Sequence, residues 1–319
     1  MRAQIVAFLR AGGDFEQTAL QLYRWQRAHN TEYDRFCGAA QPTRWEDIPA
    51  VPASLFRDLF LTCFDPAAAS VCFETSGTTA GRPGRVRLLD TEVYDLSARL
   101  HAERCLGLVP PRAISLVPTD DHSSLGHMCR HLSPETRPFF SSETGVDAPG
   151  AWAALRAATA PVFVPTTALA LVDLLAHGHD PVALPEGSIL MLTGGFKGRR
   201  RAVDPEDLLQ RLSRHLPGCR IVGEYGMSEL SSQLWAVPAG ERFVPPPWLR
   251  VLAVDPWTGT GQTSGQLRFF DLANHQTVLA IETGDQGTVH PDGSVTLEGR
   301  LPGARPRGCS LSVEEARAR

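Results

Sequence analysis

One short loop combines hydroxyl groups, glycines and positive charge. Residues 75–85 read T-S-G-T-T-A-G-R-P-G-R and lie between the apolar runs 71–74 and 86–89, which are typical of strands. Small residues let the backbone approach a ligand, and successive backbone N–H groups can then converge on an anion. The loop therefore has the groups that bind a triphosphate, although the spacing of a Walker A loop is absent. A glycine- and threonine-rich hairpin turn is the alternative.

Strands and helices are predicted to alternate after this loop. The predicted strands are 71–74, 113–117, 161–165, 188–192 and 220–223, and the predicted helices are 92–108, one near Leu125 with Ser124 as its N-cap, 151–160, 167–177 and 204–216. This alternation predicts a mostly parallel α/β sheet, in which ligands bind beyond the carboxyl ends of strands. Loops begin at Thr75, Thr193 and Glu224, each after a predicted strand, so they can line one crevice.

The two ends of the sequence show other patterns. Apolar residues at helical spacing over 15–36 predict a helix on the N-terminal side. On the C-terminal side, Gly, Pro and Asp-Gly turns separate short apolar runs and predict β hairpins over 249–254, 266–271, 278–281, 287–290 and 294–297. We expect a single domain over 1–319, made of a helical segment 1–65, an α/β nucleotide-binding region 66–245 and a β-rich region 246–319.

Composition narrows the class of protein. The chain has 319 residues, of which 43% are hydrophobic, and a net charge of −4, so a large core is expected and nucleic acid is not the expected partner. No apolar run approaches the roughly 18 residues that a membrane helix needs, and we expect no membrane span. Seven scattered cysteines without a C-x-x-C pair predict reduced thiols in a cytoplasmic protein.

Several motifs together resemble a known superfamily. T-S-G-T-T (75–79), Gly194-Gly195, Y-G-M-S-E (225–229), T-G-D (283–285) and Gly299-Arg300 occur in the order typical of acyl-adenylate-forming enzymes. Longer stretches, over 194–201, 223–233, 246–251, 271–274 and 307–311, resemble the LuxE-type long-chain acyl-protein synthetases. The resemblance covers nearly the whole chain. It implies the large N-terminal domain of the acyl-adenylate-forming fold, with mostly parallel sheets covered by helices and a β-rich C-terminal part.

The resemblance also implies a reaction and assigns roles to residues. ATP would activate a fatty acid to acyl-AMP, and the acyl group would then pass to a cysteine thiol. Glu229 would bind Mg²⁺, a hard cation that prefers carboxylate oxygen. The residues that would contact the nucleotide are Thr75, Ser76, Gly77, Thr78 and Thr79 at the β- and γ-phosphates, Ser228 at the α-phosphate, Gly194, Gly195 and Tyr225 at adenine, Asp285 and Arg300 at the ribose, and Glu224 and Gly226 on either side of Tyr225. The alternative for Asp285 is a turn residue before Gly287.

The sequence departs from the superfamily pattern in the phosphate loop and in the source of the catalytic lysine. Ala80 stands where the phosphate loop usually has glycine, and the later lysine of that loop is missing, with Arg85 as the nearest substitute. The resemblance to LuxE-type proteins also implies that the small C-terminal domain, which carries a catalytic lysine in most of the superfamily, is absent, as it is in LuxE-type proteins. Lys197 is the only lysine and is our candidate for the cation that assists adenylation. A solvent-facing lysine is the alternative.

Cys309 is the candidate acyl acceptor. It follows Gly308 in a polar tail, close behind Arg305 and Arg307, and nearby cations lower the pKa of a thiol. The R-G-C-S-L stretch is similar to the site of the acylated cysteine in LuxE-type proteins. An ordinary exposed cysteine near the terminus is the alternative, and Cys129 would then be the next candidate.

Two other function classes remain open. The chain can be an adenylating ligase that delivers the acyl group to CoA or an acyl carrier protein, or a nucleotide-binding partner subunit without turnover. A downstream partner such as an acyl reductase or a carrier protein is expected for the first reading. His127 and His131 are four residues apart on a predicted helix, a spacing that can bind metal, but no third ligand is evident.

Overall fold

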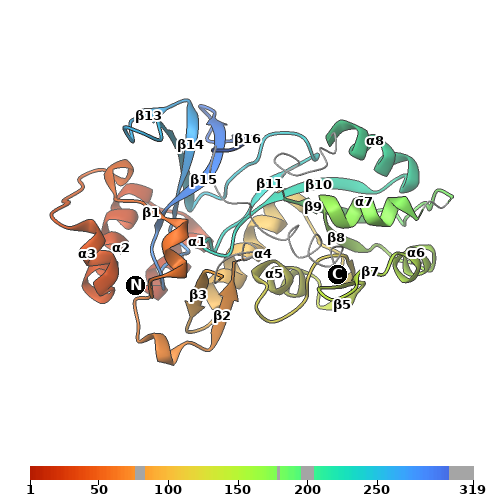
Figure 1. Ribbon diagram of the computed structural model, residues 1–319, viewed down its shortest axis with the longest axis horizontal. Coiled ribbons are helices and arrows are strands. Elements are labelled where there is room, and N and C mark those ends of the chain that lie inside the picture. Colours follow the sequence, from red (N-terminus) through yellow and green to blue (C-terminus); the bar gives the residue numbers. More distant parts are fainter. Residues whose placement is uncertain (76–82, 178–179, 195–204, 302–319) are drawn as a thin grey trace. The chain divides into compact units, whose positions relative to one another are not determined.

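The computed structural model describes residues 1–75, 83–177, 180–194 and 205–301 (Figure 1). The remaining stretches, 76–82, 178–179, 195–204 and 302–319, lie outside the described residues. The chain divides into two compact units. The first contains the described residues of Met1–His101, Met227–Leu234 and Val244–Arg305, and the second those of Ala102–Gly226 and Trp235–Phe243.

A parallel sheet forms the centre of the second unit. Its strands run in the order β11-β10-β9-β8-β4-β5 and comprise β4 (Arg112–Ser115), β5 (Glu135–Pro138), β8 (Phe163–Thr167), β9 (Ile189–Thr193), β10 (Arg220–Tyr225) and β11 (Leu234–Ala236). The pairs β4–β5, β4–β8, β8–β9 and β9–β10 are all parallel. The prediction of a mostly parallel α/β sheet is therefore confirmed.

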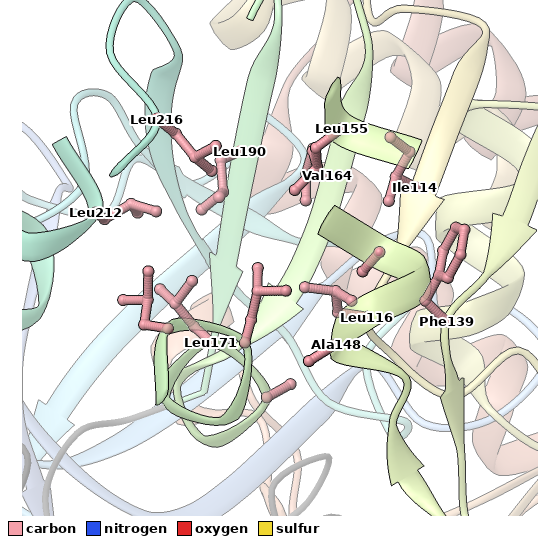
Figure 2. Close-up of a cluster of buried hydrophobic side chains, with 14 of the residues drawn as sticks. Ile114, Leu116, Phe139, Ala148, Leu155, Val164, Leu171, Leu190, Leu212 and Leu216 are labelled. Atoms are coloured by element: carbon pink, nitrogen blue, oxygen red, sulfur yellow. The ribbon is translucent and has the colours of Figure 1, made fainter. Parts of the chain in front are cut away.

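Helices bury one face of this sheet. The helices of this unit are α5 (Ser124–Leu132), α6 (Ala148–Arg156), α7 (Ala168–Ala176) and α8 (Pro205–His215), and a short hairpin joins β6 (Phe140–Ser141) to β7 (Gly145–Val146). Figure 2 shows Ile114, Val164 and Leu190 from the strands packing with Leu155 and Leu171 from the helices. All residues of β8 and β9 are buried, as expected for parallel strands, which read as continuous apolar runs rather than alternating ones.

The N-terminal ends of these helices follow from capping side chains. The prediction of Ser124 as the N-cap of α5 is wrong by one residue, because Ser123 is the extended residue whose Oγ accepts from the Gly126 N–H at 3.0 Å. Thr167 caps α7 in the same way, and its Oγ1 accepts from the Ala170 N–H at 3.1 Å. Both caps satisfy backbone donors that the first helical turn leaves without partners.

The first unit combines N-terminal helices with a second sheet. Its helices are α1 (Arg2–Ala11), α2 (Phe15–His29) and α3 (Thr31–Cys37), short 3₁₀ turns lie at Trp45–Asp47, Ala53–Arg57 and Pro66–Ala68, and α4 (Glu92–Leu106) begins in this unit. The sheet contains β1 (Val51–Pro52), β12 (Leu249–Val254), β13 (Gly261–Gln262), β14 (Ser264–Asp271), β15 (Ala280–Val289) and β16 (Val295–Arg300). Apart from the parallel β1–β15 pair, its strands are antiparallel, as the hairpin pattern predicts.

One predicted turn of this sheet is a strand instead. The runs 278–281 and 287–290 were expected to be separate strands, but β15 continues through the residues between them. A shift of register between Gln286 and Gly287 opposite β16 absorbs the irregularity. Gly287 is needed there, because a Cβ would lie 2.5 Å from the Thr296 carbonyl oxygen. Gly287 therefore permits close strand pairing rather than a chain reversal.

The hydroxyl-rich loop belongs to a separate hairpin of the first unit. Strands β2 (Val71–Glu74) and β3 (Arg85–Leu88) pair with each other and are antiparallel. The expectation that the loop at Thr75 leaves a strand of the parallel sheet is wrong, because β2 pairs with the strand that directly follows the loop rather than with a strand beyond a crossover helix. In the described part of the chain, no helix is both long and apolar enough to cross a membrane.

Candidate active site

In the second unit, predicted site residues meet at the carboxyl ends of β9 and β10. Thr193 and Glu224 are directly opposite each other in this parallel pair, and the Thr193 Oγ1 donates a hydrogen bond to Glu224 Oε2. Gly194 follows with φ +85°, a left-handed conformation that glycine adopts without steric cost. The Tyr225 ring contacts Phe243 edge to face, with centroids 6.2 Å apart. The structure thus brings Gly194, Glu224 and Tyr225 to one sheet edge, as predicted.

Burial controls the charge of Glu224. Glu224 is only 5% exposed, and this burial raises the pKa of its carboxyl group to about 7. The hydrogen bond from Thr193 lowers the pKa but does not offset the effect of burial. A carboxyl group removed from water favours its neutral form. Near pH 7, Glu224 is therefore a pH-sensitive link between the two strand ends that carry Gly194 and Tyr225.

This link predicts a pH effect on stability. The pKa of Glu224 is higher in the folded protein, about 7, than its ordinary value of 4.5, so the folded state binds more protons and loses stability as the pH rises through that window. Glu224→Gln mimics the neutral acid, so this variant should not show that loss. Between pH 5 and 7.5 its free energy of unfolding should fall by on the order of 1–3 kcal/mol less than that of the wild type. Urea unfolding of both proteins at a series of pH values checks it, and parallel stability curves would contradict it.

In the first unit, Thr75 and Gly84 close the base of the hydroxyl-rich loop. The Thr75 N–H donates to the Gly84 carbonyl oxygen at 2.8 Å, and the Gly84 N–H donates to Thr75 Oγ1 at 2.8 Å. Arg85 pairs across the hairpin with Glu74, with 3.0 Å between Nε and Oε1. Most of the predicted phosphate contacts, Ser76, Gly77, Thr78 and Thr79, lie outside the described residues.

The segment that follows β10 contacts the same hairpin. Ser228 Oγ donates to the Glu74 carbonyl oxygen at 3.2 Å, at the end of β2, so Ser228 lies beside the base of the hydroxyl-rich loop. Glu229 is 6% exposed, and its backbone carbonyl accepts from Asn274 Nδ2 at 2.9 Å. The structure therefore places Thr75, Ser228 and Glu229 in one region of the first unit.

A predicted ribose contact lies on the second sheet. Asp285 of β15 and Arg300 of β16 are directly opposite each other, with 3.2 Å between Arg300 Nε and Asp285 Oδ1. Asp285 is 8% exposed and lies within a strand, so the alternative of a turn residue is excluded. Its N–H donates to Thr283 Oγ1 at 3.0 Å. The paired carboxylate is a group that can accept hydrogen bonds from neighbouring hydroxyls.

The sequence analysis missed the residues that support the segment after β10, which contains Ser228 and Glu229. Asp271 and Asn274 stand in the D-L-A-N stretch, which contributed only to the resemblance. Both are buried, and Asp271 accepts hydrogen bonds from the Ser231 N–H at 3.1 Å and the Ser232 hydroxyl at 2.8 Å. Burial raises the pKa of Asp271 to about 7. The available signal was that two polar residues, Asp271 and Asn274, stand three positions apart in an otherwise apolar stretch, which is typical of buried polar groups with hydrogen-bond partners.

Five of the six cysteines in the described part of the chain are unfavourable nucleophiles. Cys129 is fully buried, and burial raises the pKa of both Cys63 and Cys219 to about 12. Burial also raises the pKa of Cys37 and Cys105. Since the thiolate is the nucleophile, these groups are poor acyl acceptors near neutral pH. The predicted catalytic residues Cys309 and Lys197, like Gly195, lie outside the described residues.

The described donors fit a magnesium nucleotide better than a transition metal. Glu229 and Asp285 offer carboxylate oxygens, and Thr75 and Ser228 offer hydroxyls, which suit Mg²⁺, ribose and phosphate. Among the described residues, no three or more His, Cys, Asp or Glu side chains gather at a potential metal site. His127 and His131 of α5 therefore do not belong to such a cluster.

Comparison with known proteins identifies the fold. No protein-family model matches the sequence, and no curated protein matches it significantly. ATP-bound MatB from Rhodopseudomonas palustris is similar in structure, with a TM-score of 0.54 and 16% identity over 74% of this chain and 49% of that one. The long-chain-fatty-acid-CoA ligase FadD1 from Archaeoglobus fulgidus has a TM-score of 0.54 and 15% identity over 75% of this chain and 53% of that one.

A third solved structure gives the same result. The AMP complex of the O-succinylbenzoate coenzyme A synthetase MenE from Bacillus subtilis has a TM-score of 0.52 and 17% identity over 74% of this chain and 50% of that one. The chain thus spans about half the length of the solved structures that it matches. At these identities the likeness concerns the backbone rather than the reaction. The protein has the α/β fold of the acyl-adenylate-forming enzymes.

Proposed function

We propose that this protein uses ATP and Mg²⁺ to activate a fatty acid as an acyl-adenylate and then transfers the acyl group to a protein cysteine, as LuxE-type acyl-protein synthetases do. One observation carries the proposal: within an acyl-adenylate-forming fold, Ser228 of the Y-G-M-S-E motif is hydrogen-bonded to the strand end from which the hydroxyl-rich loop begins. Ser228 therefore adjoins the start of the hydroxyl-rich loop although 154 positions separate Ser228 from Glu74.

The proposal assigns the nucleotide to residues of the predicted motifs. Glu229 would hold Mg²⁺, whose charge neutralises phosphate oxygens, and Ser228 would contact the α-phosphate. Asp285, with Arg300 beside it, would accept hydrogen bonds from the ribose. The other assigned residues are Thr75, Ser76, Gly77, Thr78 and Thr79 for the outer phosphates and Gly194, Gly195 and Tyr225 for adenine, with Glu224 and Gly226 on either side of Tyr225. Lys197 would supply the cation that stabilises negative charge during adenylation.

The second half-reaction is assigned to Cys309. The thiolate would attack the acyl carbon, the bond from that carbon to the phosphate oxygen would break, and AMP would leave while the new thioester forms. The burial of Cys63 and Cys129 in the described part of the chain supports this choice, because a buried thiol cannot easily reach an acyl-adenylate. An acyl reductase or a carrier protein would then receive the acyl group.

Pyrophosphate–ATP exchange over a panel of carboxylic acids tests the activation step. Labelled pyrophosphate should enter ATP only when Mg²⁺ and an accepted acid are both present, and long-chain acids should give the highest rates. Reversal of acyl-adenylate formation is the only route for the label under these conditions. Absence of exchange with every acid, from acetate to palmitate, would refute the activation step.

Delivery of the acyl group to CoA is a second candidate. It is favoured by the similar structures described as a long-chain-fatty-acid-CoA ligase and an O-succinylbenzoate coenzyme A synthetase. Labelled fatty acid distinguishes the two outcomes. An acyl label that stays on the denatured polypeptide supports protein acylation, whereas label that appears only in a CoA thioester supports the second candidate.

A further inference from the structure

An irregular stretch of backbone, buried from residue 229 to residue 233, carries Glu229. Residues 226–233, all described, connect β10 to β11 without forming a helix or a strand. Its internal support includes a hydrogen bond of 3.0 Å from the Leu230 N–H to the Met227 carbonyl oxygen. Buried backbone groups outside regular structure need other partners, because leaving them without hydrogen bonds is costly. Side chains must therefore hold this segment in place.

Asn274 supplies partners on both sides of Leu230. Its Nδ2 donates to the Glu229 carbonyl oxygen at 2.9 Å, and its Oδ1 accepts from the Ser231 N–H at 2.8 Å. Nδ2 also donates to the Val278 carbonyl oxygen at 3.2 Å. Two carbonyl acceptors face the nitrogen and one N–H donor faces the oxygen, so the partners define the orientation of the amide.

Asn274 is itself held rigidly. It is 2% exposed, and its own carbonyl oxygen accepts from Gln26 Nε2 of helix α2 at 2.8 Å. Gln26 Oε1 in turn accepts from the Leu279 N–H at 3.0 Å, where β15 is about to begin. A buried side chain with every polar group in use has little freedom to move. The amide therefore transmits the position of a helix and a strand to the Glu229 backbone.

We propose that Asn274 is a positioning residue that fixes the Glu229 backbone so that the Glu229 side chain binds Mg²⁺ in the required place. This inference rests on the proposed function, because Glu229 is the magnesium ligand only there. Outer partners that orient a metal ligand commonly change metal affinity when they are removed, although they never touch the metal. Asn274 would act on the metal only through the Glu229–Ser231 backbone.

Asn274→Ala tests the inference in two ways, with Asn30→Ala as a matched control. Asn30 is also 2% exposed, and its Oδ1 also accepts a hydrogen bond from a backbone N–H, that of Tyr33 at 3.0 Å, where Asn30 caps α3. In the nucleotide-free protein, a peptide covering 227–233 should take up deuterium about 10-fold faster in Asn274→Ala than in wild type. Asn30→Ala should leave that peptide at the wild-type rate.

The second readout is the Mg²⁺ concentration that half-saturates pyrophosphate–ATP exchange. Asn274→Ala should raise it about 10-fold, and Asn30→Ala should not change it. If Asn274→Ala does not fold, Asn274→Asp carries the same expectation, because it keeps an acceptor for the Ser231 N–H and loses the donor to the Glu229 carbonyl.

The outcomes separate this inference from the proposed function. Wild-type deuterium uptake at 227–233 in Asn274→Ala overturns the inference without bearing on catalysis. Faster uptake with an unchanged Mg²⁺ requirement overturns the positioning role while exchange activity upholds the proposed function. Absence of exchange in the wild-type protein refutes the proposed function, and the inference fails with it.

Discussion

Replacing Glu229 by glutamine is expected to reduce the rate of acid-dependent pyrophosphate–ATP exchange by at least about 100-fold. Rates fall by about this factor when an enzyme loses one group that stabilises charge in the transition state. The change keeps the size of the side chain and removes the negative charge that would hold Mg²⁺. Glu229 is buried, and its backbone carbonyl is bonded to Asn274, so the neutral side chain should occupy the same place. Initial rates at saturating ATP and acid measure the effect.

Glu298→Gln provides the control for this prediction. Glu298 is an exposed residue of β16 that accepts hydrogen bonds from Ser264 at 3.2 and 3.3 Å, and we assign it no role in nucleotide binding. The same loss of one carboxylate should leave exchange there at the wild-type level. A Glu229→Gln protein that exchanges as fast as wild type over a Mg²⁺ titration would remove Glu229 from the metal site.

Cys309→Ser is expected to abolish acyl labelling of the protein while leaving pyrophosphate exchange intact. A serine hydroxyl has no accessible anion near neutral pH, so the acyl-adenylate still forms but meets no thiolate. The measurement is the amount of labelled fatty acid that stays on the denatured polypeptide and is released by hydroxylamine. The exchange rate of the same preparation shows that the first half-reaction has survived.

Cys105→Ser is the matched control for the second half-reaction. Cys105 is half-buried on α4, and burial raises its pKa, so it should contribute no acyl label. Hydroxylamine-labile label that persists in Cys309→Ser would rule out Cys309 as the acceptor. The fully buried Cys129 would then have to become accessible during the reaction, which the described structure gives no reason to expect.

Local sequence pattern determined the helices and the four central strands of the second unit, but not β5, β6, β7 or β11. The runs that predict strands at 188–192 and 220–223 correspond to β9 and β10, and the predicted helix 204–216 corresponds to α8. Adjacent parallel strands end at the same sheet edge, so the meeting of Thr193 with Glu224 followed from the pattern as well. Apolar runs and helix-start residues act over a few positions, which is why they can be read without a structure.

Only the tertiary structure decided which strands pair and what supports the site. The loop at Thr75 closes an antiparallel hairpin, and β15 runs through Gly284 and Gly287, because the partner strand rather than the local residue decides whether a glycine turns or extends the chain. Asn274 contacts Glu229 across 45 positions of sequence. A hydrogen bond between residues so far apart leaves no periodicity in the sequence, since it depends on the distance that folding alone creates.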